Sequence, residues 1–408
     1  MFNAWHDDNK GDCAILHASL DLTRRRWPDA HIRVHGLIED ADPAHGRAFR
    51  HAPSAPVRFS PRSSAAPVPR SDRNKSMLHL TGWAAGSVAL LNPKTQRVRD
   101  AVRDLEAVVM VGGSNVFDSG RHAPMSTARL LRVLAPARAA LDLGIPTYFL
   151  GHTLGPFRTR ASRSLMTSVG RAGAHFVLRE ELSRARAASL SIPADQVTVL
   201  PDVAFLIEPT VDDQVRRAWQ TAGIGATDRY VVLAPRTHPY DDAEQSRSRR
   251  LAGEMAKLAD HLIATDRVDR VVILPQVVGP TAVEDDRRIA AQILADVASD
   301  RVSVMTEDLA PRQLAAFYGR AELTIGVRLH AVILAMAGGA PVFAIEYFTD
   351  KTQGILEMAG LGDCWDRYDE FTAATITNRW DELSSAARRA EVAQTVASLR
   401  DRISGWTE

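Results

Sequence analysis

The sequence predicts an α/β protein with two parallel-sheet domains, and three observations support this fold class. Short apolar runs typical of buried strands alternate with longer helical patterns along most of the chain. The apolar pattern weakens between residues 202 and 228, which separates two alternating series. The chain has 408 residues, more than one hydrophobic core usually supports.

We therefore expect an N-terminal domain at residues 1–205 and a C-terminal domain at residues 229–375, joined by a linker. Residues 376–408 contain an amphipathic, charged helix pattern, and we expect this helix to pack back across the domain boundary. Residues 52–75 are rich in Pro, Ser and Arg. Because such a composition cannot build a core, we expect a mobile surface loop there.

Composition argues against several classes of function. The formal net charge is +1, which gives no electrostatic footprint for nucleic acid or an anionic membrane. No apolar run reaches the ~18–20 residues that a transmembrane helix needs, and the first residues do not resemble a signal peptide. Cys13 and Cys364 lie far apart without metal-ligand spacing. We expect reduced thiols, no metal site and a cytoplasmic protein.

The N-terminal half begins with a polar loop at residues 6–12 (HDDNKGD), followed by an apolar helix pattern. Only five residues precede the loop, so we expect either a very short first strand or a true start upstream of Met1. The loop suits a tight strand-to-helix turn, in which a glycine allows close backbone approach. Asp12 is either a simple helix cap or a group that faces a ligand, and the pattern leaves both interpretations open.

A buried strand at residues 106–111 opens into Gly112-Gly113-Ser114-Asn115, and Asp118 follows shortly after. Glycines at the carboxyl end of a strand allow backbone N–H groups to approach a ligand. The same strand-then-turn pattern recurs at residues 146–155 and 175–180, with helix patterns between. This spacing favours a parallel sheet with right-handed crossovers.

In the C-terminal half, polar side chains follow the ends of the predicted strands. Arg236 follows the strand at residues 229–235, and Gln276 follows the strand at residues 271–275. Glu346 and Lys351 come after a later strand that ends at Ile345. The carboxyl ends of parallel strands share one edge of the sheet, so we expect these side chains to share one rim.

The stretch from residue 321 to residue 354 carries the most chemical information. A buried strand ends at Gly326, and an apolar helix then places Arg328 and His330 in its first turn. A helix N-terminus attracts anions, an arginine can fork onto phosphate or carboxylate, and a histidine titrates near neutral pH. Without further context, His330 is equally well explained as a core residue beside an apolar helix.

Taken together, these short motifs resemble those of the polysaccharide pyruvyl transferase family over about residues 6–360. No single motif is specific, but their order is. The series comprises N-x-GD before the first helix, GG-S with a following Asp, G-x-x-x-GP (Gly151 to Pro156), R-E-x-x-S (Arg179 to Ser183), PD-x-AF (Pro201 to Phe205), G-x-RLH (Gly326 to His330) and GxPV-x-x-I-x-Y-x-x-x-K (Gly339 to Lys351).

The resemblance implies two Rossmann-like domains facing a cleft, as in the GT-B architecture of glycosyltransferases. It implies an enzyme that moves the enolpyruvyl unit of phosphoenolpyruvate onto hydroxyls of a sugar, glycan or sugar nucleotide as a ketal, releasing phosphate. Phosphoenolpyruvate is then a co-substrate, and no further cofactor and no nucleic acid is expected.

The resemblance also implies roles for individual residues. His330 is expected to give or take the proton, and Arg328 with its helix N-terminus to hold the phosphate. Arg236 or Arg179 is expected to bind the carboxylate. The other expected substrate-binding residues are Gln276, Glu346 and Lys351 on the donor side, and Asn9, Asp12, Ser114 and Asp118 on the acceptor side.

Two alternatives stay open at this point. A nucleotide-sugar glycosyltransferase of the same fold would also place basic groups against a diphosphate, so the fold alone cannot decide. A non-catalytic ligand-binding relative would keep the scaffold without turnover. Release of phosphate from phosphoenolpyruvate in the presence of a sugar acceptor distinguishes all three.

Overall fold

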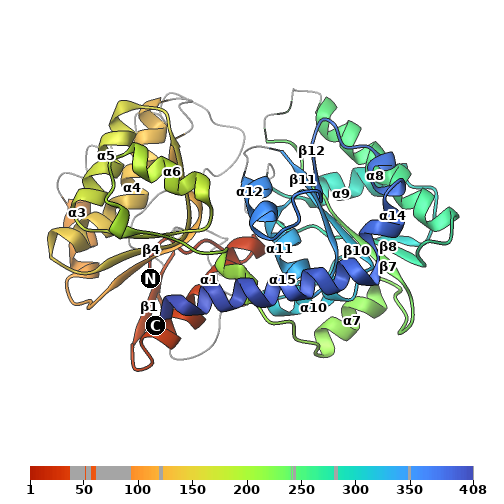
Figure 1. Cartoon of the computed structure of the whole chain (residues 1–408), viewed down its shortest axis with the longest axis horizontal. Helices are drawn as coiled ribbons and strands as arrows, with labels where there is room; N and C mark the ends of the chain where they lie inside the picture. Colours follow the sequence, from red (N-terminus) through yellow and green to blue (C-terminus); the bar gives the residue numbers. More distant parts are fainter. Residues whose placement is uncertain are drawn as a thin grey trace. The chain divides into compact units, whose positions relative to one another are not determined.

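The computed structural model describes residues 1–36, 51, 57–60, 93–118, 123–239, 241, 245–279, 284–347 and 351–407 (Figure 1). The chain forms two compact units. Unit 1 comprises Met1–Asp7, Ile15–Val203 and Thr407–Glu408, and unit 2 comprises Asp8–Ala14 and Ala204–Trp406. Each unit is built on a parallel sheet, which confirms the predicted α/β fold class.

Unit 2 contains a six-stranded parallel sheet in the order β12-β11-β10-β7-β8-β9. Its strands are β7 (Tyr230–Ala234), β8 (Arg270–Ile273), β9 (Val302–Val304), β10 (Leu323–Gly326), β11 (Val342–Glu346) and β12 (Trp365–Arg367). The chain builds outward from β7 to β9, and then returns to the other side of β7 with β10. This is the Rossmann order, and its topological switch point lies between β7 and β10.

Helices cover both faces of this sheet (Figure 1). They are α8 (Ser246–Ala264), α9 (Arg287–Asp296), α10 (Pro311–Gly319), α11 (Leu329–Ala337) and α12 (Lys351–Met358). Helix α8 packs against α9, and α10 packs against α11. Because the sheet is covered on both faces, every residue of β7 is buried, as the continuous apolar run in the sequence predicts.

Two glycines allow α10 and α11 to approach closely. A Cβ atom at Gly338 would lie 2.0 Å from the carbonyl oxygen of Ala315, and one at Gly319 would lie 2.3 Å from the carbonyl oxygen of Gly338. Gly339 has a φ of 90°, so it ends α11 in a conformation that favours glycine. The contact fixes the helix whose N-terminus carries Arg328.

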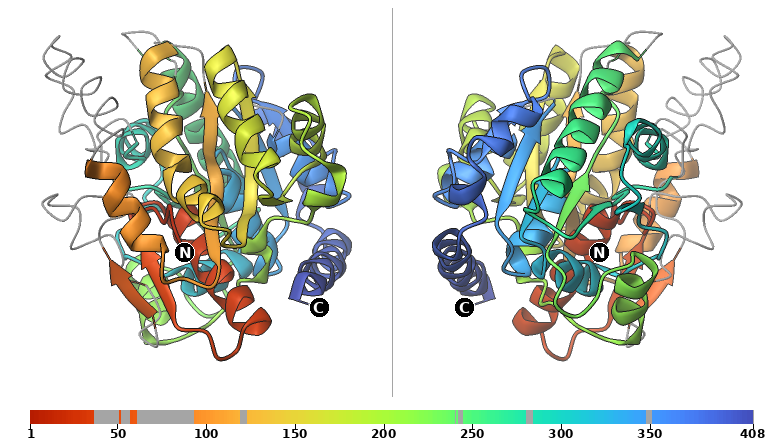
Figure 2. Two further views of the ribbon diagram at one scale, coloured as in Figure 1. Left: turned by 90° about the vertical axis from the view of Figure 1, so that its left-hand side faces the viewer. Right: turned by 90° about the vertical axis from the view of Figure 1, so that its right-hand side faces the viewer.

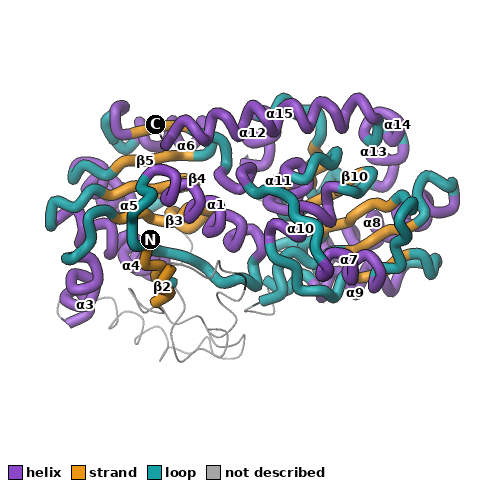
Figure 3. The backbone as a smooth tube through the Cα atoms, turned by 90° about the horizontal axis from the view of Figure 1, so that it is seen from below, coloured by secondary structure: helices purple, strands orange, loops and turns teal. Residues whose placement is uncertain are grey.

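The last helices are α13 (Ala373–Thr377), α14 (Trp380–Leu383) and α15 (Ala386–Ser404), and α15 is one uninterrupted helix (Figure 3). Arg389 of α15 donates to the carbonyl oxygens of Gly319, Ala321 and Gly339. These bonds satisfy carbonyl groups at and just beyond the ends of α10 and α11. Helix α15 is thus bound to unit 2, and its expected packing across the domain boundary stays a prediction.

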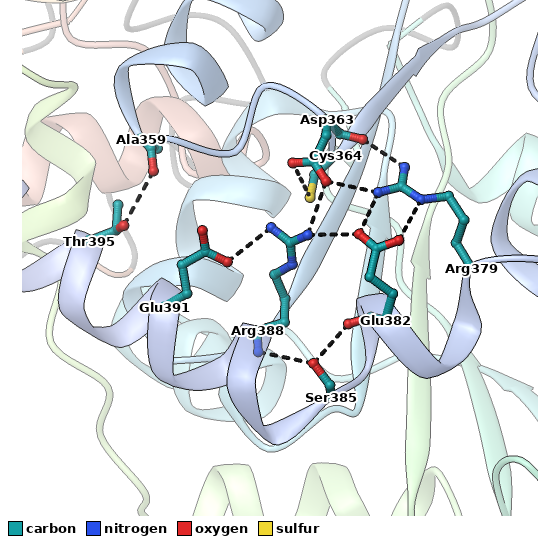
Figure 4. A network of polar contacts seen from close by, with 9 residues as sticks. All are labelled: Ala359, Asp363, Cys364, Arg379, Glu382, Ser385, Arg388, Glu391 and Thr395. Carbon is teal, nitrogen blue, oxygen red and sulfur yellow. Dashed lines mark hydrogen bonds and ion pairs between the residues drawn. The ribbon is translucent and has the colours of Figure 1, made fainter.

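A network of ion pairs ties the start of α15 to the preceding segment (Figure 4). Arg379 and Arg388 both donate to Asp363 and to Glu382, at distances between 2.7 and 3.0 Å. The network is largely exposed, but charges that share partners stabilise more than isolated surface pairs do. It links the start of α15 to Asp363 and to the segment from Arg379 to Glu382.

Unit 1 contains four parallel strands, namely β3 (Val108–Asp118), β4 (Thr147–Phe157), β5 (His175–Leu178) and β6 (Val197–Val199), and a parallel pair, β1 (Ile32–His35) and β2 (Val57–Ser60). Residues 1–4 connect the two sheets. His35 N–H donates to the carbonyl oxygen of Met1, and Phe2 N–H donates to that of Val109. The first residues therefore act as the very short strand that the sequence predicts.

The helices of unit 1 are α1 (Lys10–Arg26), α3 (Pro93–Val102), α4 (Ala123–Asp142), α5 (Arg160–Arg171) and α6 (Glu181–Ser189). In the left view of Figure 2, α4 and α5 lie together in amber and yellow in front of the strands. Only the first turn of α1 clusters with unit 2, and the remainder clusters with unit 1. Among the described residues, none of the helices combines the length and the apolar content that spanning a bilayer requires.

Two local expectations, for residues 52–75 and for Gly112–Asn115, are wrong. Val57–Ser60, inside the expected loop at residues 52–75, pairs with β1 as a parallel strand; the rest of that segment lies outside the described residues. The change from unit 1 to unit 2 after Val203 falls at the start of the expected linker, which also contains helix α7 (Asp213–Thr221), capped by the side chain of Asp212. Strand β3 continues through Gly112–Asn115 to Asp118, with register shifts after Gly113. Backbone pairing outweighs a weak apolar pattern in both strand segments.

Candidate active site

The switch point of unit 2 brings two arginines to one edge of its sheet. Strands β7 and β10 are parallel neighbours with Ala234 opposite Gly326. Arg236 follows the first residue by two positions, and Arg328 follows the second by two positions. Ligands of open α/β sheets bind at this edge, beside the switch point.

The other expected donor-side residues follow neighbouring strands of the same sheet. Gln276 comes after β8, Glu346 ends β11, and Lys351 begins α12. His330 lies in the first turn of α11 and is half-buried. Parallel pairing of β8, β7, β10 and β11 places their carboxyl ends along one edge, so the sequence prediction of a shared rim agrees with the sheet topology.

Arg328 is held by a buried carboxylate that none of the sequence motifs contains. Its Nε and Nη2 atoms donate to Asp286 at 3.0 and 2.7 Å, and Nη2 also donates to the carbonyl oxygen of Glu284. Asp286 is completely buried and also accepts the backbone N–H of Val277 at 2.9 Å. Burial raises the pKa of the Asp286 carboxyl, whereas the positive charges of Arg328 and Arg236 oppose that shift.

Arg236 lies against Tyr347, which follows β11. Its guanidinium donates to the Tyr347 hydroxyl, and its Cζ lies 4.2 Å from the ring centroid. The Nζ of Lys351 lies 5.9 Å from the same ring. Two cations therefore share one aromatic ring, which fixes positive charge at the edge where β7 and β11 end.

A polar cluster supports the backbone after β7. The Tyr368 hydroxyl donates to the carbonyl oxygen of Arg236 at 3.0 Å, and its ring lies edge-on to His238. Nη1 of Arg247 lies 3.1 Å from Nδ1 of His238. Burial and Arg247 lower the pKa of His238, so the ring is neutral and its Nδ1 accepts a hydrogen bond.

The first turn of α1 lies over the same part of unit 2. Lys10 N–H donates to the carbonyl oxygen of Gln276, and Val278 N–H donates to that of Asp8. At Gly11, an added Cβ would lie 2.5 Å from Nδ1 of His330. Gly11 therefore has no room for a side chain, because the imidazole ring of His330 occupies that space.

The placement of this loop corrects two expectations. Asn9 and Asp12 cluster with unit 2 and not with the acceptor-side unit, because the loop bonds to the backbone after β8. Asn9 is the helix cap, since its Oδ1 accepts the N–H groups of Gly11 and Asp12 at 3.1 and 3.4 Å. Its amide also donates to the Asp12 carboxylate at 2.6 Å. Both side chains thus stabilise the start of α1.

Gln276 and Glu346 are oriented by hydrogen bonds within unit 2. The Tyr318 hydroxyl donates to Oε1 of Gln276 at 2.7 Å, and burial raises the pKa of Tyr318 well above its usual value, so it stays protonated. Among the residues that the structure describes, Nε2 of Gln276 has no hydrogen-bond partner. Glu346 accepts the N–H of Thr352 at 3.0 Å and so caps α12.

Arg179 is not available to bind a carboxylate, which corrects the sequence expectation. It lies in unit 1 and is 1% exposed. Its three nitrogens donate to Thr153, Asp202 and Ser114 at 2.8, 2.6 and 2.8 Å. Four of the ordered sequence motifs thus meet in one network around the buried Arg179, and its role in unit 1 is structural.

The remaining acceptor-side residues also have structural partners in unit 1. Ser114 is exposed, but its hydroxyl accepts the bond from Arg179. Asp118 is completely buried and accepts the N–H of Thr159 and the hydroxyl of Ser162 at the start of α5. Gly112 serves close strand packing, because a Cβ there would lie 2.3 Å from the carbonyl oxygen of Leu150. Asp118 is therefore a poor candidate for contact with an acceptor.

Two Rossmann-like units, one with a cationic switch-point edge, define a GT-B-like protein. The chain belongs to the polysaccharide pyruvyl transferase family, whose model matches residues 9–348. This match confirms the resemblance seen in the ordered motifs. The amylovoran biosynthesis protein AmsJ of Erwinia amylovora is similar, with 26% identity over 290 residues, covering 70% of this chain and 67% of AmsJ.

Solved structures share the fold at low identity. The HepE protein of Anabaena in complex with UDP and glucose has a TM-score of 0.57 and 14% identity, covering 96% of this chain and 95% of that one. The UDP-GlcNAc 2-epimerase of Neisseria meningitidis bound to UDP-GlcNAc has a TM-score of 0.55 and 13% identity, covering 96% of both chains. At such identities the likeness extends to the fold alone.

Proposed function

We propose that this protein transfers the enolpyruvyl unit of phosphoenolpyruvate onto hydroxyls of a sugar or glycan precursor as a ketal, releasing phosphate. One observation carries the proposal: the switch-point edge of unit 2 combines Arg236, Arg328 and His330. Membership of the polysaccharide pyruvyl transferase family supports a role for pyruvyl transfer in polysaccharide synthesis. The similarity to an amylovoran biosynthesis protein agrees with that role.

The cations of unit 2 suit a donor that carries a phosphate and a carboxylate. Arg328 and the N-terminal amides of α11 would hold the phosphate, since both favour an anion at that position. Arg236 would hold the carboxylate, now that Arg179 is excluded by its buried partners. Lys351 adds positive charge beside Arg236. Several fixed cations are what a small polyanion requires.

The reaction needs one proton at the methylene carbon of the donor. Protonation there gives a methyl group and an oxocarbenium-like centre at the neighbouring carbon. One sugar hydroxyl attacks that centre, and a second hydroxyl displaces the phosphate. The two hydroxyls lose two protons, of which one balances the new methyl group and the other leaves with phosphate. His330, half-buried at the start of α11, is the group we assign to proton transfer.

The test is to incubate the protein with phosphoenolpyruvate and a panel of p-nitrophenyl hexosides and sugar nucleotides. We expect phosphate release that depends on the acceptor, and a product whose mass increases by one pyruvyl ketal. Transfer of a sugar from a nucleotide, without use of phosphoenolpyruvate, would identify a glycosyltransferase instead. Binding of these ligands without any product would identify a non-catalytic relative.

A further inference from the structure

We propose that Asp286 is a positioning residue, which holds the guanidinium of Arg328 in the orientation that binds the donor anion. This inference rests on the proposed function, because the site in which Asp286 orients Arg328 is the proposed donor site. Asp286 lies in the segment between β8 and α9, whereas Arg328 follows β10. The pair therefore joins two separate strand ends at one edge of the sheet.

The geometry fixes one edge of the Arg328 guanidinium, and Nη1 lies at the opposite edge. Nε and Nη2 of Arg328 form a fork onto the two carboxylate oxygens of Asp286. Within the described part of the chain, no hydrogen bond is formed by Nη1 of Arg328, and the side chain is 12% exposed. A planar fork that is bound along one edge can present its remaining nitrogen in only one direction.

Asp286 is itself held in place. It is buried at the start of α9, and Oδ2 accepts the N–H of Val277, the residue after Gln276. The carbonyl oxygen of Glu284 accepts a third bond from Arg328. The carboxylate therefore has little freedom, and it transmits the position of the backbone after β8 to Arg328. Supporting contacts of this kind decide whether a binding group is held within the tolerance of the site.

A purely structural ion pair would have the same geometry. The test therefore needs a measured quantity that a change in stability alone does not alter, which is the affinity for the donor anion. The matched control is Asp285, the adjacent carboxylate, which forks onto Arg287 at 2.6 to 3.1 Å. The pair of Asp285 and Arg287 lies beside the pair of Asp286 and Arg328 in sequence, but the Arg287 side chain is 57% exposed. The Asp285 variant therefore removes the same kind of carboxylate–guanidinium pair, but at an arginine that is mostly exposed.

We would measure binding of phosphoenolpyruvate and of inorganic phosphate by calorimetry for wild type, Asp286→Asn and Asp285→Asn, together with KM, kcat and Tm. For Asp286→Asn we expect Kd for both anions, and KM for phosphoenolpyruvate, to rise by ~10–100-fold, since a misplaced guanidinium loses its fixed geometry. For Asp285→Asn we expect Kd for both anions, and KM for phosphoenolpyruvate, to stay within about twofold of wild type. Asp286→Glu keeps the charge and tests the same point if Asp286→Asn does not fold.

The outcomes separate the inference from the proposed function. Unchanged Kd and KM in Asp286→Asn or Asp286→Glu, with only Tm lowered, would overturn the inference and leave an ordinary structural pair. Failure of wild type to bind either anion would also overturn it. If wild type binds both anions but releases no phosphate with any acceptor, the proposed reaction fails. The shift in Kd then still decides whether Asp286 positions Arg328.

Discussion

The α carbon of Gly11 lies directly against the imidazole of His330: an added Cβ would come within 2.5 Å of Nδ1 and 2.8 Å of the histidine Cβ. Both residues belong to unit 2, although they are more than 300 positions apart in the sequence. Glycine within a helix costs ~1 kcal/mol relative to alanine. Glycine in the first turn of α1 is explained by the ring that occupies the side-chain position.

The first prediction is that Gly11→Ala lowers turnover by ~10–100-fold, because the new methyl group displaces His330 from its working position. Steady-state kinetics and thermal unfolding should be measured on the same preparation. Gly253→Ala is the control, since Gly253 lies inside α8 and a Cβ there meets nothing within 4 Å. The control should keep full activity, and equal losses in both variants would contradict the assignment.

The second prediction concerns His330 itself. His330→Gln should lower kcat by ~10²–10⁴-fold, the usual contribution of a positioned acid or base, and change the affinity for phosphoenolpyruvate little. Combining it with Gly11→Ala should cause no further loss, because both changes act on one group. If His330 is only a core residue, the variant will instead show a lower Tm with normal turnover per folded molecule.

The third prediction tests the structural role of Arg179. Asp202→Asn should destabilise unit 1 by ~3–5 kcal/mol, because it leaves a buried guanidinium without its counter-ion. Asp142→Asn, which breaks the exposed pair with Arg138, should cost no more than about 1 kcal/mol. Urea unfolding measures both. Normal stability of Asp202→Asn with a raised KM for phosphoenolpyruvate would restore Arg179 as a donor-binding residue.

The fourth prediction concerns pH. His152 in β4 is completely buried, and burial together with Arg179 lowers its pKa to about 3. Below about pH 6.5 the unfolded chain binds a proton at this ring and the folded chain does not, so the group contributes nothing to stability above that pH and favours the unfolded state below it. Its contribution falls by ~1.4 kcal/mol per pH unit as the pH drops from about 6.5 towards 3.

The matched variant for this prediction is His152→Leu, which cannot titrate. The difference in unfolding free energy between wild type and variant should change with that slope over this range of pH. Parallel stability curves for the two proteins would contradict the assignment of a neutral, buried His152.

Much of the donor side could be predicted from sequence, because strand ends in a parallel sheet necessarily share an edge. Arg236 and Arg328 follow apolar runs that are unmistakable strands, and the structure places those strands side by side. The partners of these arginines could not be predicted. The fork from Asp286 and the contact with Tyr347 depend on loop geometry, which local sequence does not encode. Adjacent acidic residues after β8 were the only signal for Asp286.

On the acceptor side, the sequence predicts the roles of the polar residues less well. Arg179, Ser114 and Asp202 stand in polar motifs at predicted strand ends, where ligands bind, yet Arg179 donates to both Ser114 and Asp202. A single sequence reveals residue type and spacing, but not that an arginine is buried. The sequence predicts the loop at residues 8–12 on the acceptor side, but it belongs to unit 2, for a similar reason. Its backbone bonds to residues after β8 span more than 260 positions, and no local pattern reports them.

The most direct test of pyruvyl transfer at the edge of unit 2 is to run the reaction in D2O and measure deuterium in the product. The methyl group of each transferred pyruvyl ketal should carry one solvent deuterium, with one phosphate released per transfer. His330→Gln should slow formation of this labelled product by ~10²–10⁴-fold. A ketal without solvent deuterium, or labelled product formed at the normal rate by His330→Gln, would contradict the account.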